Sequence, residues 1–473
     1  MILAIDQGTT GTTCLVIDDE LRVRGRGYVE IEQFFPQPGW VEHDPEELWS
    51  SVLTAAEGAL NAAGTSASGL NGIGITNQRE TTLVWERRTG RPVARAIVWQ
   101  DRRTAERCRE LPAELIRERT GLVPDPYFSA TKLEWLLART DVPRTELAAG
   151  TVDAWLVWKL TGGREHVTDI TNASRTMLLD LAKGDWDDEL LGLFGVDRGL
   201  LPRVVGSSEI VGEAEFFGAT IPIAGIAGDQ QAALFGQGCF AAGQAKATYG
   251  TGSFVLVNVG SESTAAPDGL LRTTAAVGPG AAPQFAVEGS VLVGGAAVQW
   301  LRDGLGLVAS AAETEALARS VDSSDGVVFV PALTGLGSPW WDAEARGLIS
   351  GLTRGTTRAH LARATLEAIA FQVADVLDAL PGGVEVLRAD GGATANGFLM
   401  QFQADLLGCP VEVAAESEAT ALGAAALAGL AVGVWQDLAA VAGLVRRGAR
   451  YEPGETPVGR DEWRLALRRA RLR

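Results

Sequence analysis

The apolar residues at the start of the chain fall into short runs that polar turns separate. Residues 3–18, LAIDQGTTGTTCLVID, begin and end as apolar strands, and a turn of glycine and threonine lies between them. A third strand is expected over 21–31. Asp44 fits a helix N-cap and Pro45 fits the first helical position, so a helix follows, and the buried strand GIGIT comes after it. The predicted order is β-β-β-α-β.

The second half of the chain repeats this order. Residues 243–260 again consist of an apolar run, a glycine-threonine turn and a second apolar run. The elements expected after them are a strand at 285–291, a helix over 294–305, a strand over 327–333, a long helix over 356–383, and a strand that meets a glycine pair at 391–392 and then a helix. Two similar halves predict a duplicated α/β domain. We expect the domains to be 1–235 and 236–473, sharing an interface or hinge.

Composition narrows the class of protein. With 473 residues the chain is too long for one ordinary core. Its net charge of −18 opposes binding to nucleic acid or to an anionic membrane. The uncharged run over 419–435 is shorter than a membrane span and is rich in alanine and glycine, so we expect a buried helix there. The N-terminus does not resemble a signal peptide. Four dispersed cysteines favour a reducing cytoplasm: Cys14, Cys108, Cys239 and Cys409.

The first glycine-threonine turn has the composition of a phosphate-binding loop, although it lacks the lysine of a Walker motif. Gly8 allows close approach to a ligand, and the hydroxyls of Thr9 and Thr10 and the amides around Gly11 can donate to phosphate oxygens. Asp6 would repel a phosphate unless a cation lay between them, which favours Mg²⁺. The alternative is an ordinary hairpin.

Further glycine-rich turns make the phosphate interpretation stronger. Thr251 and Gly252 form a second glycine-threonine turn, and two such turns facing each other can hold a triphosphate from both sides. The stretches GGAAVQ at 294–299 and RADGGATAN at 388–396 place glycine pairs before expected helices, where a nucleotide can approach the helix N-terminus. One such start is weak evidence, whereas the combination is specific.

Three other stretches carry polar or aromatic side chains suited to a small polyol. Arg79 and Glu80 follow a buried strand and together offer donors and acceptors for hydroxyl groups, although a structural ion pair is an alternative. Asp229 follows an apolar strand, where it is either a helix N-cap or a base. Trp99 and Tyr127 add flat faces, and core packing is the commoner role of a tryptophan.

These stretches, together with QPGWVEHDPEELW, HVTDITNASRTML and TGLGSPWWDAEARG, resemble the glycerol kinases of the FGGY carbohydrate kinase family over nearly the whole chain. The resemblance implies an α/β fold of two duplicated actin-like (ribonuclease H-like) domains with an interdomain cleft. It implies ATP-dependent phosphorylation of glycerol to sn-glycerol 3-phosphate with ATP and Mg²⁺ as cofactors. It also implies a cytoplasmic homo-oligomer, dimer or tetramer, whose partner is glycerol and not nucleic acid or membrane.

The resemblance also assigns roles to residues. Asp229 corresponds to the general base, and Asp6 and Asp229 would lie near Mg²⁺. The residues implied to contact glycerol are Arg79, Glu80, Tyr127, Asp229, Gln230, Trp99 and Phe254. The residues implied to contact the nucleotide are Thr9, Thr10, Gly11, Thr13, Thr251, Gly295, Gln299, Gly392 and Asn396.

The sequence departs from the family pattern at two places. The first loop of the family usually continues to an arginine, where this chain has Thr13, and a neutral hydroxyl cannot replace a guanidinium on a phosphate. The loop at 213–220 is shorter than the one that binds fructose 1,6-bisphosphate in some relatives and holds no histidine for phosphotransfer. We expect neither form of control.

Three alternative functions stay open at the level of sequence. Another FGGY kinase would act on a pentulose or gluconate, against which Arg79 and Glu80 argue. An actin-like ATPase would keep the glycine-threonine turns but need no polyol pocket. A non-catalytic binding protein, weakened by Thr13, would bind glycerol and turn over poorly.

Overall fold

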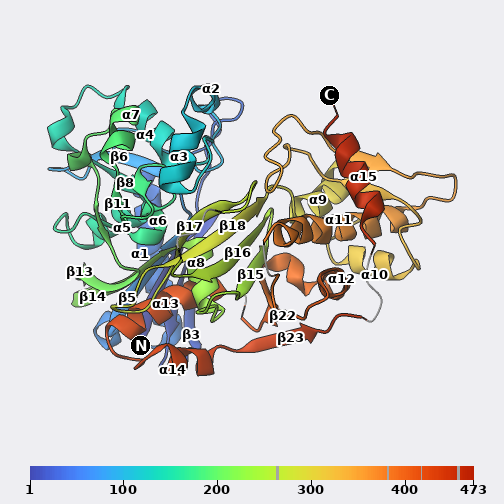
Figure 1. The fold of residues 1–473 in the computed structure, drawn as a ribbon. Coiled ribbons are helices and arrows are strands. Elements are labelled where there is room, and N and C mark those ends of the chain that lie inside the picture. Colours follow the sequence, from blue (N-terminus) through green and yellow to red (C-terminus); the bar gives the residue numbers. More distant parts are fainter. Residues whose placement is uncertain (263–265, 381–382, 417, 455–458, 473) are drawn as a thin grey trace.

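The fold consists of two α/β halves that lie side by side (Figure 1). The computed structural model describes residues 1–262, 266–380, 383–416, 418–454 and 459–472. In Figure 1 the first half runs from blue to green, and the second half runs from yellow-green to red. Each half is built around one mixed β-sheet, so the predicted fold class is confirmed.

The sheet of the first half has the strand order β13-β14-β5-β1-β2-β3. Its strands are β1 Ile2–Gln7, β2 Gly11–Ile17, β3 Val23–Glu30, β5 Gly72–Asn77, β13 Ser208–Phe216 and β14 Ala219–Gly228. β1 pairs antiparallel with β2 and parallel with β5. Helix α1, Pro45–Ala63, begins as predicted at Asp44, whose side chain accepts a hydrogen bond from the Glu46 amide, and it packs on β2 and β3.

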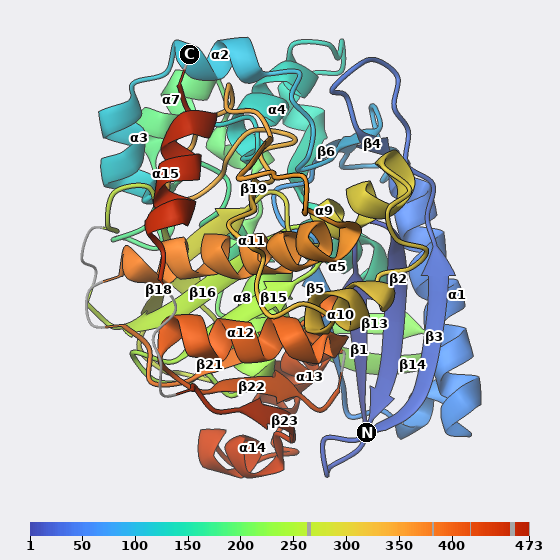
Figure 2. The ribbon, with the colours of Figure 1, turned by 90° about the vertical axis from the view of Figure 1, so that its right-hand side faces the viewer.

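The sheet of the second half has the order β17-β18-β16-β15-β21-β22-β23. Its strands are β15 Ala245–Tyr249, β16 Ser253–Gly260, β17 Leu271–Ala275, β18 Gln284–Val291, β21 Leu387–Asp390, β22 Val411–Ala414 and β23 Arg447–Tyr451. β15 pairs antiparallel with β16 and parallel with β21, as β1 does with β2 and β5. This shared order confirms the predicted duplication. Helices α11, Arg358–Asp378, and α12, Gly397–Leu407, cross this half (Figure 2).

Inserted elements stand above the sheet of the first half. A small sheet has the order β4-β7-β6-β8, with β6 at Thr82–Glu86 and β8 at Leu147–Thr151, and α4, Ser129–Leu137, packs on β6. The first half further contains β4 Glu42–His43, β7 Ala96–Ile97, α2 Ala105–Arg109, α3 Ala113–Thr120, α5 Val152–Leu160, β9 Val167–Asp169, α6 Ile170–Ala173, β10 Leu179–Asp180, β11 Asp185–Trp186, α7 Asp188–Phe194, β12 Arg203–Val205 and α8 Asp229–Gly236. The second half further contains α9 Gly295–Gln299, α10 Glu313–Arg319, β19 Val328–Val330, β20 Leu348–Ser350, α14 Leu438–Leu444 and α15 Asp461–Ala470.

Helix α13, Ala419–Ala431, belongs to the second half of the chain but packs against β1, β5 and β14 of the first half and against α8. Small residues make this contact close. A Cβ atom on Gly423 would lie 1.9 Å from the Ala232 carbonyl oxygen, and one on Gly74 would lie 2.2 Å from that of Ala424. The two halves therefore share a core, and the division between 235 and 236 stays a prediction. In the described residues no helix is long and apolar enough to cross a membrane.

Two elements differ from the sequence prediction. The glycine pair at 391–392 does not open a helix directly, because a 3-10 turn over Gly392–Ala395 intervenes and α12 begins at Gly397 with Asn396 as its N-cap. The Asn396 side chain accepts a hydrogen bond from the Leu399 amide at 3.0 Å. The helix expected over 294–305 is α for its first turn, α9, and a π-turn over Trp300–Gly304 follows.

Candidate active site

Arg79, two residues after the end of β5, lies at the centre of the residues implied to contact glycerol. Its Nε lies 3.3 Å from Asp229 Oδ1 and 3.8 Å from Glu80 Oε1, and its Nη2 donates to the Tyr127 hydroxyl at 3.4 Å. Asp229 is the first residue of α8 and is 31% exposed, whereas Arg79 is 1% exposed. Burial raises the pKa of Asp229, and the positive charges of Arg79 and Lys246 oppose the rise. The fold thus assembles four of the predicted residues from three distant segments.

Two buried residues that sequence reasoning missed hold this cluster. Glu288, on β18 of the second half, pairs with Arg79 through two bonds of 2.6 and 3.0 Å. Arg175 donates to Glu80 Oε1 at 2.6 Å and to Glu288 Oε1 at 3.0 Å. Burial alone would raise the pKa of Glu288, but Arg175 and Arg79 outweigh it and hold that pKa at about 2. The signal in the sequence was a lone carboxylate inside the apolar strand FAVEGSV.

The backbone at Glu80 is strained. Its φ of 60° lies in the left-handed region, which a residue with a long side chain seldom adopts. Three side chains donate to its carbonyl oxygen: Thr82 Oγ1 at 2.9 Å, Ser129 Oγ at 3.1 Å and Lys132 Nζ at 3.2 Å. Strained residues of this kind concentrate at functional sites.

Aromatic rings lie next to the charged cluster. The ring centroid of Trp99 is 5.5 Å from that of Tyr127 and 6.3 Å from that of Phe254, both in edge arrangements. Phe254 lies on β16, so the second half contributes to this group. All three rings are half-buried, which leaves part of each face free for a ligand. The Trp99 indole NH donates to Thr9 Oγ1 at 2.9 Å and thereby joins the aromatic group to the first glycine-threonine turn.

Gln230 is connected to the second half through Lys246. The Lys246 ammonium, on β15, is buried and donates to Gln230 Oε1 and, at 2.8 Å, to Thr248 Oγ1. Burial lowers the pKa of Lys246, and the carboxylates of Asp390 and Asp229 oppose the change. Sequence reasoning did not single out this lysine, because a single cation in a strand resembles an ordinary edge residue.

The first turn is compact. The Gly8 amide donates to the Gly11 carbonyl at 3.0 Å. A Cβ atom on Gly11 would lie 2.5 Å from the hydroxyl oxygen of the exposed Tyr28, so a side chain there would displace the Tyr28 ring. Thr10 is exposed at the tip. Asp6 and Thr13 are register partners across β1 and β2. Thr13 is 9% exposed, so the position at which the family resemblance implies an arginine holds a nearly buried hydroxyl.

Among the described residues, Asp6 is an unpaired carboxylate that could bind a cation. It forms no hydrogen bond or ion pair within the described part of the chain. Burial raises its pKa to about 8, and repulsion from Asp229 and then from Glu418 adds to the rise. Mg²⁺ is commonly held by one or two carboxylates together with substrate phosphates, and the carboxylates of Asp6 and Asp229 fit this pattern. The described residues contain no metal-binding group of three or more histidines, cysteines or acids.

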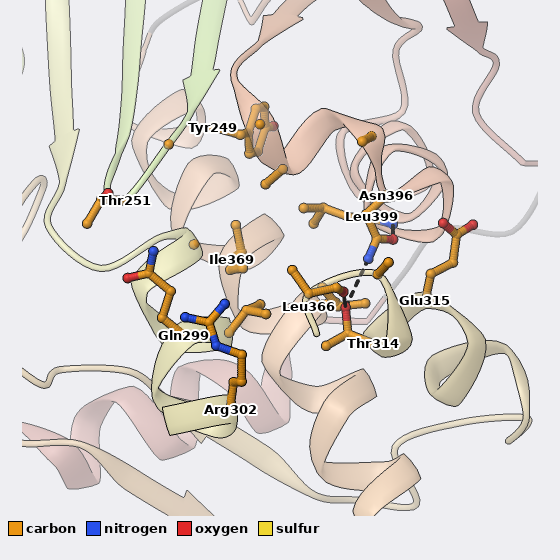
Figure 3. Close-up of a pocket in the computed structure, with 18 residues that line it drawn as sticks. Tyr249, Thr251, Gln299, Arg302, Thr314, Glu315, Leu366, Ile369, Asn396 and Leu399 are labelled. Carbon is orange, nitrogen blue, oxygen red and sulfur yellow. Dashed lines mark hydrogen bonds between the residues drawn. The ribbon is translucent and has the colours of Figure 1, made fainter. Parts of the chain in front are cut away.

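A cavity of about 430 Å³ lies in the second half (Figure 3). Five predicted nucleotide residues line it: Thr251, Gly295, Gln299, Gly392 and Asn396. Leu366, Ile369 and Leu399 give it apolar walls suited to a base. Asn396 Nδ2 donates to Thr314 Oγ1 at 3.2 Å, the bond dashed in Figure 3. Sequence reasoning missed two charged residues of the lining, Arg302 and Glu315.

The predicted nucleotide residues of the first half do not line this cavity. They are Thr9, Thr10, Gly11 and Thr13, and they belong to the first turn and to β2. Thr9 instead contacts Trp99 of the aromatic group. The predicted residues therefore form two sets, one around Arg79 and Asp229 and one around the cavity.

Known proteins resemble this chain over its whole length. The FGGY family of carbohydrate kinases matches with its N-terminal domain over residues 1–236 and with its C-terminal domain over residues 245–432. Glycerol kinase 2 of Thermotoga maritima is 52% identical over 488 residues, 99% of this chain and 98% of that protein. A glycerol kinase of Deinococcus radiodurans is 53% identical, covering 99% and 97%. The crystal structure of Plasmodium falciparum glycerol kinase with ADP is 34% identical with a TM-score of 0.92, covering 100% and 98%.

Proposed function

The chain belongs to the FGGY family of carbohydrate kinases, and on that premise we propose that it is a glycerol kinase, which transfers the γ-phosphoryl group of ATP to glycerol and forms sn-glycerol 3-phosphate and ADP. Relatives of more than half identity over almost the full length bear that name. The observation that carries the proposal is the buried contact of Arg79 with both Glu80 and Asp229, beside half-buried aromatic rings.

The chemistry of this cluster suits a triol. Arg79 donates to glycerol oxygens, Glu80 accepts from hydroxyl groups, and Tyr127 and Gln230 add further polar contacts. Trp99 and Phe254 pack on the carbon atoms. Because buried partners already hold these polar groups in place, they lose little conformational entropy when glycerol binds. An analogue that lacks a hydroxyl leaves one of them unpaired and binds weakly.

Asp229 is the proposed general base. Its carboxylate lies at the edge of the cluster and is part-exposed, so it can reach the terminal hydroxyl of glycerol and accept its proton as the oxygen attacks phosphorus. In phosphoryl transfer the protein mainly positions the reactants and stabilises charge on the phosphoryl oxygens. Thr9, Thr10 and Gly11 from the first half, and Thr251 from the second, are the proposed donors to those oxygens.

We further propose Mg²⁺ as the metal, held at Asp6 and Asp229. When bound, it neutralises phosphate charge during transfer. The nucleotide base occupies the cavity around Gly392 and Asn396. A cytoplasmic homo-oligomer, dimer or tetramer, is proposed by analogy with the family, and light scattering of the purified protein tests the oligomeric state.

The decisive experiment is ADP release from Mg-ATP with glycerol, xylulose, ribulose, gluconate or no acceptor. Release only with glycerol supports the proposed function and indicates that Thr13 is tolerated. Release with a pentulose or gluconate instead assigns a different FGGY substrate. Equal release without an acceptor favours an ATPase. Glycerol binding by calorimetry without any release indicates a non-catalytic protein.

A further inference from the structure

Among the residues that the structure describes, Lys132 is a buried cation whose hydrogen bonds go only to backbone carbonyls. It lies on α4 and is 0% exposed. Its Nζ donates to the Tyr127 carbonyl at 2.6 Å and to the Glu80 carbonyl at 3.2 Å. Within the described ranges it forms no ion pair with a carboxylate. Both residues that it contacts belong to the set proposed to bind glycerol, and they come from segments far apart in the chain.

A buried ammonium at this position carries a free-energy cost. Removing the charge from water disfavours the ionised form, and burial lowers the pKa of Lys132 to about 7. Methionine would fill a similar volume on an apolar helix without that cost. The neighbouring residues Leu133, Leu136 and Leu137 of α4 are apolar and buried, so stability alone favours an apolar side chain here. A lysine at this position is therefore explained by its two hydrogen bonds to the Tyr127 and Glu80 carbonyls and not by stability.

Those bonds act on a strained piece of backbone. Left-handed φ at a residue such as Glu80 costs on the order of 1–3 kcal/mol and persists only when the surroundings fix it. Of the three donors to the Glu80 carbonyl, two, Ser129 and Lys132, come from the start of α4. Only Lys132 also reaches the Tyr127 carbonyl. It thus joins the two segments whose side chains meet at Arg79.

We propose that Lys132 is a positioning residue for polyol recognition, whose ammonium holds the backbone of Glu80 and Tyr127 so that both side chains face the glycerol site. The identity of the ligand in this role, glycerol, rests on the proposed function. Lys132 does not contact the ligand or the reacting atoms. Its effect is on the affinity for the acceptor and not on the affinity for ATP. The cavity proposed for the nucleotide base is lined by residues of the second half, and the hydrogen bonds of Lys132 go to Glu80 and Tyr127 and not to the first glycine-threonine turn.

The test compares Lys132→Met with Lys183→Met, a lysine whose side chain is 63% exposed in a turn away from the site. Steady-state kinetics give KM for glycerol, KM for ATP and kcat. We expect Lys132→Met to raise KM for glycerol about 10-fold or more, because small displacements of binding groups have large effects, and to leave KM for ATP unchanged. Lys183→Met leaves all three unchanged. An unchanged KM for glycerol in Lys132→Met overturns the proposal, as does an equal loss of affinity for both substrates.

Hydrogen exchange of the free protein supplies a readout that does not depend on activity. We expect the amides over 79–82 and 127–129 to exchange faster in Lys132→Met, with the rest of the first half unchanged. A general acceleration indicates a merely structural role and overturns the proposal. If glycerol does not stimulate the wild-type enzyme, the proposed function fails, and the exchange comparison still decides the role of Lys132.

If Lys132→Met does not fold, Lys132→Gln replaces it, because glutamine keeps a hydrogen-bond donor. We expect Lys132→Gln to raise KM for glycerol by a smaller factor. An unchanged KM for glycerol in this variant overturns the proposal.

Discussion

Arg79 and Glu288 form a two-bond ion pair that joins the two halves of the molecule. The guanidinium is 1% exposed and the carboxylate 0% exposed, so water does not screen the pair. Arg79 also touches Asp229, the proposed base. The second half of the chain therefore helps to orient a site whose other charged residues come mostly from the first half.

Replacing Glu288 by alanine is expected to lower the free energy of unfolding by about 3–5 kcal/mol, because Arg79 and Arg175 remain as buried, unpaired charges. Urea denaturation measures the change. Glu20→Ala is the control, since Glu20 pairs with Arg22 at the surface and its loss costs about 1 kcal/mol or less. Equal effects of the two substitutions would contradict the buried network.

Asp229→Asn is expected to reduce kcat by about 100-fold or more, because asparagine cannot accept the hydroxyl proton. Glycerol affinity should change little, since the amide keeps the size and one acceptor oxygen. Calorimetry with glycerol and steady-state kinetics separate the two effects. Turnover close to that of the wild type would end the assignment of Asp229 as the base.

Thr13→Arg is expected to lower KM for ATP several-fold. Thr13 is the register partner of Asp6, so a guanidinium there meets a carboxylate whose pKa is raised and presents forked donors toward the first turn. Titration with ATP at fixed glycerol concentration measures the change. Thr13→Val, which has no hydrogen-bond donor, serves as the control. A higher KM for ATP in Thr13→Arg would show that this chain has no room for an arginine at position 13.

The stability of the second half should depend on pH through Asp375 of α11. Burial raises the pKa of Asp375 to about 6, although the Trp463 indole NH donates to its carboxylate at 2.8 Å and opposes the rise. A raised pKa means that the folded state binds the proton more tightly than the unfolded state. The contribution of Asp375 to the free energy of unfolding is therefore fully present below about pH 4 and is lost as the pH rises through 6.

Asp375→Asn keeps the acceptor for Trp463 and removes the charge. Its free energy of unfolding should equal that of the wild type near pH 4 and exceed it at pH 8 by up to about 3 kcal/mol. Denaturation curves at several pH values give the difference. Asp461→Asn, at a fully exposed position, should show no such trend. A difference that does not grow with pH would contradict the raised pKa.

Local sequence patterns predicted most of the elements, because glycine-threonine turns, an aspartate N-cap and apolar runs act over a few residues. They located Arg79, Glu80 and Asp229 for the same reason. They did not reveal that Glu288 and Arg175 bind these residues, because charge pairing between residues 95 to 209 positions apart leaves no periodic signal. The left-handed φ of Glu80 was also hidden, since nothing distinguishes that glutamate from its neighbours until Lys132, Ser129 and Thr82 surround its carbonyl.

Helix α13 has a consequence for how this protein is made. The ribosome completes β1, β5 and β14 long before it reaches Ala419–Ala431, the segment that covers them. Until then the groove at Gly74 and Gly225 presents bare backbone and apolar side chains to the cell. We therefore expect the nascent first half to need chaperones or delayed folding, and a chain truncated before α13 to be sensitive to proteases.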